Sequence, residues 1–218
     1  MNSSVGAHIW RAAALVFSIL AVGCVTGRQV SEEIACGGKG PDKVPGMQRM
    51  RTVAALSPFG DGDYWYLTES MTWVSGDRFV VTPKGFVTDF ASVPRPLWHI
   101  LPKWGGYGVA AVIHDYLYWS QHISRRDADL WLLKTMEEME VGWFHARVIW
   151  GAVRLFGGIA WNGNARRRFA QDIACIPEGA FPRDPRERWK EAKARIKKTP
   201  GFVAPAPPEP PAKPRSVY

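Results

Sequence analysis

The sequence predicts an α+β fold, with a small antiparallel β-meander followed by a helical subdomain built on an antiparallel αα-hairpin. Turn residues punctuate residues 63–94, and the segments between them are rich in aromatic and β-branched residues. From Gly106 onward, apolar residues recur at steps of three and four, which is the helical period. Only residues 120–123 separate the first two helical patterns, so these helices are expected to pack antiparallel.

Three strands are expected within residues 63–94. Aromatic and β-branched residues alternate in the first strand, and the sequence SGD at 75–77 then forms a turn. RFVVT follows as the second strand, and the turn TPKG at 82–85 leads into FVTDF as the third. Pro94 ends the pattern because proline cannot donate a ladder hydrogen bond.

Three helices are expected after the strands. Ser124 is a good N-cap for the second helix, and Asp127 three residues later completes a short capping box. The second helix should run to Gly142. The third follows directly and is expected to end at the glycine pair 157–158, since glycine favours helix C-termini.

Residues 1–24 have the pattern of an export signal. Arg11 precedes an apolar run that is much shorter than the roughly 20 residues of a membrane-spanning helix. The run ends in LAVGC at 20–24, which resembles a bacterial lipoprotein box in which Cys24 carries the lipid. The expected protein is therefore exported, either periplasmic or anchored to a membrane through Cys24. Ordinary cleaved export and an uncleaved anchor or cytosolic protein are the alternatives.

The rest of the chain divides by composition. We expect a linker, a folded domain, a basic helix and a disordered proline-rich tail, over residues 25–55, 56–180, 181–199 and 200–218. The remaining cysteines, Cys36 and Cys175, are either a disulfide pair in an oxidising compartment or two unrelated buried thiols.

Charge and aromatic content suggest the class of partner. The net charge is +8, and the chain has 11 tryptophans. A basic protein with many amphipathic rings suits a membrane surface or lipid. No zinc-finger spacing, P-loop or dinucleotide fingerprint is present, so no nucleic-acid partner is expected. The sequence identifies no protein partner.

Residues 110–136 place titratable groups inside an apolar, aromatic run. His114 and Asp129 lie about eight and seven residues from the middle of the expected turn, so they reach nearly equal heights in an antiparallel pair. Tyr118 is four residues after His114 and shares its helix face, whereas Asp115 points about 100° away. A hydrogen bond between His114 and Asp129 is therefore expected, with Tyr118 beside it.

A histidine held by a carboxylate is the base half of hydrolytic chemistry, because the carboxylate fixes the tautomer and stabilises the imidazolium. The sequence has no Gly-x-Ser-x-Gly motif, so water would be the nucleophile. Asp115 would hold a hard cation that polarises an ester carbonyl. Alternatively, His114 is a structural histidine bonded to Asp129, and Asp115 pairs with Arg125 or Arg126.

The pattern His114-Asp115-x-x-Tyr118, followed by Arg-x-Ala-Asp, resembles the core of secreted phospholipase A-two enzymes. It resembles more closely the parvoviral capsid and microbial forms that lack dense disulfides. The resemblance implies these roles: His114 as the base, Asp115 as a calcium ligand, Tyr118 as a hydrogen-bond donor to the carboxylate partner, and Asp129 as that partner with Asp127 in reserve.

The calcium loop of those enzymes is glycine-rich and lies upstream of the histidine. Here the segment KWGGYG at 103–108 has the glycines, but it lies closer to the histidine and lacks the tyrosine-first order. Calcium is the cofactor that the resemblance implies.

A second resemblance covers about residues 60–160. The segments GFVTDFASVPRPLW, HDYLY and RRDADLWLLKTM are very similar to those of domain-of-unknown-function family 1353, which is common in phage and proteobacterial genomes. This resemblance directs attention to Thr88, Asp89 and Ser92 as a supporting loop, with Asp89 as a further ligand or hydrogen-bond acceptor. Alternatively, Asp89 and Ser92 only tie down their turn.

Two functions follow as hypotheses. In the first, an exported envelope protein hydrolyses a phospholipid or another ester, using His114 and Asp129 with water. In the second, the protein is a non-enzymatic structural or partner-binding module of a phage or envelope, and its His-Asp-Tyr cluster is a polar staple in the core.

Overall fold

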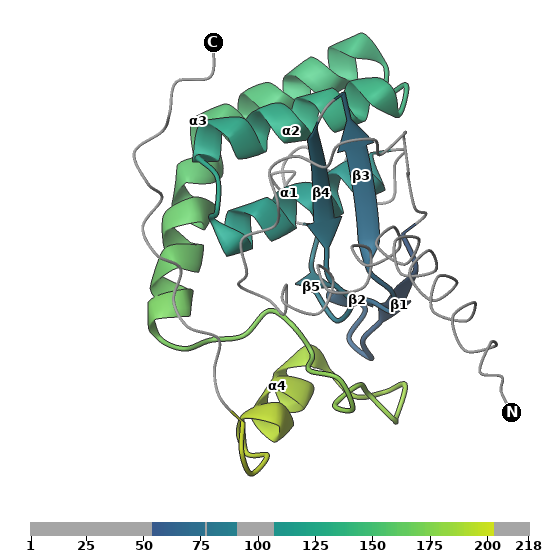
Figure 1. Cartoon of the computed structure of the whole chain (residues 1–218), viewed down its shortest axis with the longest axis vertical. Coiled ribbons are helices and arrows are strands. Elements are labelled where there is room, and N and C mark those ends of the chain that lie inside the picture. The colour runs from purple at the N-terminus through teal and green to yellow at the C-terminus, as the bar shows by residue number, and fades with distance from the viewer. Residues whose placement is uncertain (1–53, 77, 91–106, 203–218) are drawn as a thin grey trace, which may run out of the picture. The chain divides into compact units, whose positions relative to one another are not determined.

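The computed structural model describes residues 54–76, 78–90 and 107–202 (Figure 1). The expected export signal, Ser92, and most of the expected linker and proline-rich tail lie outside these residues. The fold is α+β, as the sequence predicts. Its strands and helices are β1 (Leu56–Pro58), β2 (Trp65–Leu67), β3 (Met71–Ser75), β4 (Arg78–Thr82), β5 (Val87–Thr88), α1 (Gly108–Ser120), α2 (Arg125–Glu138), α3 (Trp143–Phe169) and α4 (Trp189–Lys197).

The strands form two small antiparallel sheets, so the prediction of one three-stranded meander is wrong in detail. β3 and β4 form a hairpin, while β5 pairs back with β2 in a sheet of order β1-β2-β5. The chain leaves the hairpin at Gly85, whose φ is +82°. The Gly85 N–H donates to the Leu67 carbonyl at 2.8 Å, and this turn carries β5 onto β2 instead of β4.

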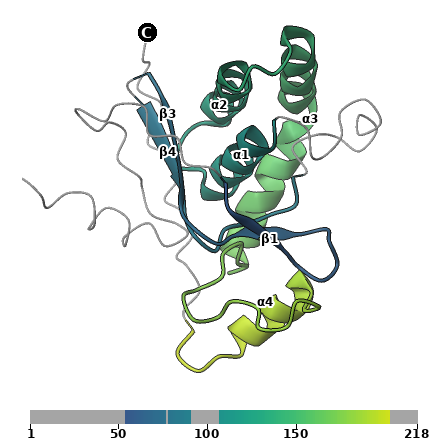
Figure 2. The same cartoon turned by 90° about the vertical axis from the view of Figure 1, so that its right-hand side faces the viewer.

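The first two helices begin and end close to where the sequence predicts. Ser124 caps α2, and its hydroxyl accepts a hydrogen bond from the Asp127 N–H at 3.1 Å. α3 differs from the prediction because it continues through Gly157 and Gly158 to Phe169. Figures 1 and 2 show that α3 bends part-way along, as helices often do near glycine pairs.

The helices and strands enclose two hydrophobic clusters. β2 divides them, because the side chains of Tyr66 and Leu67 alternate across the sheet and enter different clusters. The larger cluster lies between the strands and α1, α2 and α3, and Figure 2 shows these three helices on one side of the β3–β4 hairpin. The smaller cluster holds Trp189, Ala192 and Ile196 of α4, so the basic helix has a buried face.

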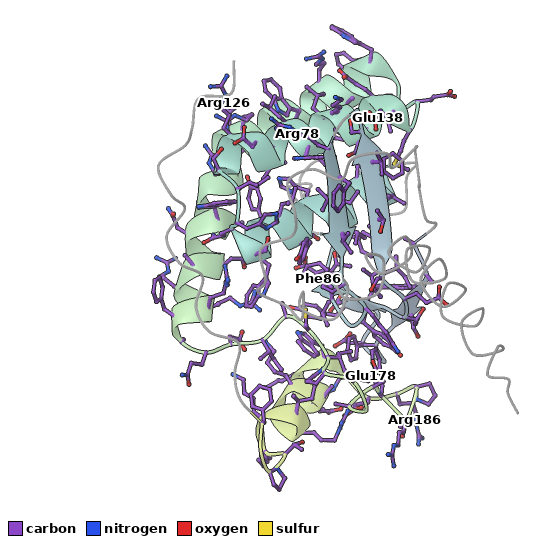
Figure 3. The ribbon with its side chains drawn as sticks, viewed as in Figure 1. Arg78, Phe86, Arg126, Glu138, Glu178 and Arg186 are labelled. Atoms are coloured by element: carbon purple, nitrogen blue, oxygen red, sulfur yellow. The ribbon has the colours of Figure 1, made fainter. Side chains whose placement is uncertain are left out.

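Two side chains labelled in Figure 3 join the strands to the helices. Glu138 of α2 accepts hydrogen bonds from Trp73 Nε1 at 2.8 Å and Ser75 Oγ at 2.6 Å, both on β3. Phe86 packs edge-on against Tyr116 of α1, with 5.4 Å between ring centroids. These contacts fix α1 and α2 against the strands. No helix in the described part of the chain is long and apolar enough to span a membrane.

Candidate active site

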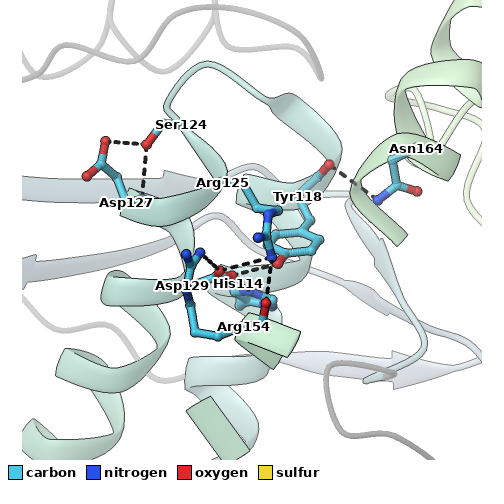
Figure 4. Close-up of polar contacts among 8 residues, drawn as sticks. All are labelled: His114, Tyr118, Ser124, Arg125, Asp127, Asp129, Arg154 and Asn164. Carbon is cyan, nitrogen blue, oxygen red and sulfur yellow. Dashed lines mark hydrogen bonds and ion pairs between the residues drawn. The ribbon is translucent and has the colours of Figure 1, made fainter. Parts of the chain in front are cut away.

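A buried carboxylate joins the first two helices at the level that the sequence predicts. His114 Nε2 lies 3.1 Å from Asp129 Oδ1, and the Tyr118 hydroxyl donates to the same oxygen at 2.6 Å (Figure 4). The side chains of His114 and Asp129 are 2% and 0% exposed. Both predicted contacts of Asp129 are therefore present, and they occur within the core. Asp127, the reserve candidate, instead caps its own helix through Ser124.

Two arginines also reach Asp129. Arg154 of α3 donates to Asp129 Oδ2 at 2.6 Å, and Arg125 lies 3.5 Å from the same oxygen. Arg125 also donates to the Arg154 carbonyl at 3.3 Å. The structure therefore gives Asp129 four partners on three helices, and Arg125 is paired with Asp129. Sequence reasoning missed Arg154, although it is the one charged residue in the apolar run from 148 to 165.

The surroundings set the charge states of this group. Burial lowers the pKa of His114, although its bond to Asp129 acts in the opposite direction. Burial raises the pKa of Asp129, but hydrogen bonds from His114, Tyr118 and Arg154 outweigh burial and leave the pKa below its usual value. Burial, followed by the bond to Asp129, raises the pKa of Tyr118. At neutral pH the cluster therefore holds a neutral imidazole, a phenol and a carboxylate.

A glycine allows α3 to approach this cluster. A Cβ at Gly157 would lie 2.4 Å from the Tyr118 hydroxyl, much closer than real Cβ atoms come to another heavy atom. Next to it, a Cβ at Gly158 would meet nothing within 4 Å. The space around Tyr118 therefore depends on the absence of a side chain at Gly157, whereas Gly158 is sterically unconstrained.

A cavity of about 410 Å³ borders the cluster. His114, Asp115 and Tyr118 contribute to its wall, while much of the remaining wall is apolar. The apolar and aromatic lining residues are Phe86, Val87, Trp119, Ala152, Val153, Phe156, Ala160, Ala174 and Trp189. This volume and lining suit a small organic ligand with an apolar portion.

Asp115 lies on the cavity wall and contacts β5. Thr88 donates its hydroxyl to Asp115 Oδ2 at 2.5 Å, and the Thr88 oxygen accepts a hydrogen bond from the Phe90 N–H at 3.1 Å. Phe90 is a buried residue with φ of +54°, a conformation that is uncommon for a bulky side chain. Thr88 thus orients Asp115 and also holds a strained turn.

Asp89 also borders the cavity. Burial raises the pKa of Tyr64, another lining residue, and the negative charge of Asp89 contributes to the same shift. Among the described residues, no group of three or more His, Cys, Asp or Glu side chains is arranged to hold a metal ion. Asp115 provides one carboxylate of the oxygen-rich set that calcium prefers. Most of the KWGGYG segment, the expected source of carbonyl ligands, lies outside the described residues.

Comparison with known proteins gives one result. Residues 65–153 match the model of a protein family of unknown function, DUF1353. Over these residues, which are fewer than half of the chain, the sequence is similar to DUF1353. No curated protein and no solved structure matches the chain.

The region that matches DUF1353 contains most of the cluster but not all of it. His114, Tyr118 and Asp129 lie within residues 65–153, whereas Arg154 and Gly157 follow the matched region on the same helix. The cluster therefore depends on α3 continuing beyond the family match.

Proposed function

We propose that this domain hydrolyses a carboxylic ester, with His114 activating water and Asp129 holding His114 in place. One observation carries this proposal: the imidazole that bonds to Asp129 also borders the 410 Å³ cavity. A buried histidine that served packing alone would not need a cavity beside it. The tilted Tyr118 ring, 4.0 Å from the His114 ring between centroids, supports the imidazole from one side.

The proton transfers follow from which ring nitrogen of His114 carries the proton. Nε2 of His114 carries a proton and donates a hydrogen bond to the Asp129 carboxylate, so Nδ1 is the basic nitrogen. Nδ1 takes a proton from water as the water oxygen attacks the ester carbonyl, and Asp129 stabilises the imidazolium that forms. The tetrahedral intermediate then expels the alcohol, which receives the proton from His114. The products are a carboxylic acid and an alcohol.

The lining of the cavity supports an ester with an apolar acyl group. Phe86, Val153 and Phe156 provide apolar surface, and the small side chains of Ala152 and Ala160 leave room beside them. An acyl chain would bury this apolar surface, and each Å² removed from water would stabilise the bound ester by about 25 cal/mol.

We also propose that the protein is exported, with lipid at Cys24 as the anchor. Cys175 forms a disulfide bond, and this supports an oxidising compartment. The other cysteines of the chain, Cys24 and Cys36, both lie outside the described residues.

A second candidate function rests on a different observation. Asp129 is fully buried and joins α1, α2 and α3 through three hydrogen bonds and an ion pair with Arg125, which is also what a structural staple does. In this reading the domain is a non-enzymatic module that binds a partner.

The two candidates differ in what His114→Gln changes. Purified protein would be assayed on p-nitrophenyl esters of increasing acyl length and on phospholipid vesicles, alongside thermal melting. The hydrolase proposal expects activity in the parent and a loss of about 100-fold or more in kcat, since a general base contributes roughly 10²–10⁴-fold. His145→Gln is the matched control, because His145 is exposed on α3 and lies outside the cluster.

The staple candidate expects no ester hydrolysis in the parent and a lower Tm for His114→Gln, because an unpaired buried group costs about 1–3 kcal/mol. Hydrolysis that survives His114→Gln undiminished would overturn the role of His114. If the variant is too unstable to assay, the pH dependence of kcat/KM in the parent tests the same residue. The rate should fall as the pH is lowered through the pKa of folded His114, which burial places below the usual value of about 6.5.

A further inference from the structure

Exposed apolar side chains follow one face of α3. Phe144, Leu155, Ile159 and Phe169 are 66%, 78%, 77% and 71% exposed. At about 100° per residue, these four positions fall within roughly 80° of one another around the helix axis, with Phe144 and Phe169 on opposite sides of the bend in α3 (Figure 1). We call Phe144, Leu155, Ile159 and Phe169 the α3 stripe. A run of this kind on a soluble surface marks an interaction site more often than isolated exposed residues do.

The stripe is continuous with the cavity. Phe156 is 61% exposed, lies three residues before Ile159 and so is its neighbour on the helix surface, and also lines the cavity. Ala152, three residues before Leu155 on the same side of the helix, lines the cavity as well. A surface that covers the stripe would therefore also meet the mouth of the cavity.

The charge of α3 indicates the kind of surface. The helix has no aspartate or glutamate in 27 residues, and of its five arginines one is buried and three pair with carboxylates outside the helix. Arg166, which is exposed, lies on the same side as the stripe by helical spacing. A second copy of the chain would bring this basic helix against itself, because a two-fold interface pairs the same patch on both subunits. An anionic surface complements it.

We propose that the α3 stripe docks on a lipid bilayer with anionic head groups, which places the mouth of the cavity against the lipid. The apolar side chains enter the boundary between head groups and acyl chains, and Arg166 contacts the head groups. Docking by the stripe does not require that the domain hydrolyses anything, and it is separate from any lipid on Cys24.

Vesicle co-sedimentation tests this proposal. The full chain would carry Cys24→Ser in every sample, so that no lipid anchor contributes. Vesicles of phosphatidylcholine alone would be compared with an equal mixture of phosphatidylcholine and phosphatidylglycerol. Binding is expected to favour the anionic vesicles and to weaken as salt is added.

Leu155→Gln and Leu130→Gln form a matched pair. Both leucines are exposed, at 78% and 42%, but Leu130 lies on α2 and outside the stripe. Leu155→Gln should lower the partition coefficient roughly fivefold or more, because it removes a leucine side chain that the lipid would bury. Leu130→Gln should bind as the parent does.

The outcomes separate the docking site from the proposed chemistry. His114→Gln leaves the stripe intact and should bind vesicles normally, whether or not the domain is a hydrolase. Equal binding by Leu155→Gln and Leu130→Gln, or no binding of the parent to anionic vesicles, overturns the docking proposal. A dimer in sedimentation equilibrium that Leu155→Gln dissociates would assign the stripe to a second copy, which also overturns it.

Discussion

At the residue scale, the chemistry of the cluster depends on how Asp129 divides its two oxygens. Oδ1 accepts from His114 and Tyr118, while Oδ2 meets the arginines Arg154 and Arg125. Hydrogen bonds from His114, Tyr118 and Arg154 keep the carboxylate ionised despite its burial, and this charge balances a proton that His114 gains during a reaction. The same arrangement makes the cluster sensitive to pH, because His114 is buried in its neutral form.

We expect the free energy of unfolding to fall as the pH is lowered below 6.5. The pKa of His114 is lowered in the folded state, so the unfolded chain binds a proton in this range before the folded chain does. One such group contributes a slope of at most about 1.4 kcal/mol per pH unit. The pKa of Asp129 is lowered from 3.8, so its contribution is lost at more acidic pH.

Denaturant unfolding of the parent and His114→Gln at pH 5 to 7.5 measures this effect. In His114→Gln, the free energy of unfolding should change less with pH between the folded and unfolded pKa values of His114. The exposed control His145→Gln should show the same pH dependence as the parent. Parallel curves for the parent and His114→Gln would show that His114 titrates normally in the fold.

Asp115 provides a second prediction at this scale. If calcium binds the folded state at Asp115, calcium should raise the Tm of the parent and leave Asp115→Asn unchanged. At about 100 times the dissociation constant the gain is about 2.7 kcal/mol. Asp63→Asn is the control, because Asp63 lies on an exposed loop between β1 and β2. Equal shifts in the parent and Asp115→Asn would place any calcium elsewhere.

At the element scale, α3 decides whether the cluster is complete. It brings Arg154 to Asp129 and closes over Tyr118 at Gly157. The sequence predicted the pairing of α1 and α2 well, because capping at Ser124 and helical spacing are local signals. It did not predict that α3 continues past Gly158, since glycine pairs usually end helices and only packing against α1 outweighs this preference.

The adjacent glycines of α3 give a paired test. Gly157→Ala should lower the free energy of unfolding by about 1–3 kcal/mol, because the new Cβ overlaps the Tyr118 hydroxyl and displaces it from Asp129. Gly158→Ala should raise stability by up to about 1 kcal/mol, since alanine favours helix and nothing obstructs it. Chemical denaturation of both variants measures the difference. Equal effects would mean that α3 does not pack closely on Tyr118.

At the scale of the whole molecule, local sequence patterns predict the α+β class, whereas the strand pairing and the second hydrophobic cluster depend on long-range contacts. The pairing of β5 with β2 and the second cluster under α4 join segments far apart in the chain, for which the sequence carries no local signal. Asp172 makes ion pairs of the same long-range kind. It binds Arg167 of α3 and Lys193 and Lys197 of α4. Burial raises its pKa, but bonds from Lys193 and Arg167 lower it to about 2.

The disulfide of Cys175 gives the last prediction. Cys175 pairs with the backbone of Phe86, which in turn packs on α1, so the cross-link fixes a segment that supports the site. Reduction should lower the stability by about 2–5 kcal/mol. Cys36 is the expected partner, so Cys36→Ser and Cys175→Ser should both have the Tm of the reduced parent. Dithiothreitol should not change the Tm of either variant. Cys24→Ser should melt as the oxidised parent does. A Tm that dithiothreitol leaves unchanged in the parent would remove the disulfide as a support of the fold, and with it the argument for an oxidising compartment.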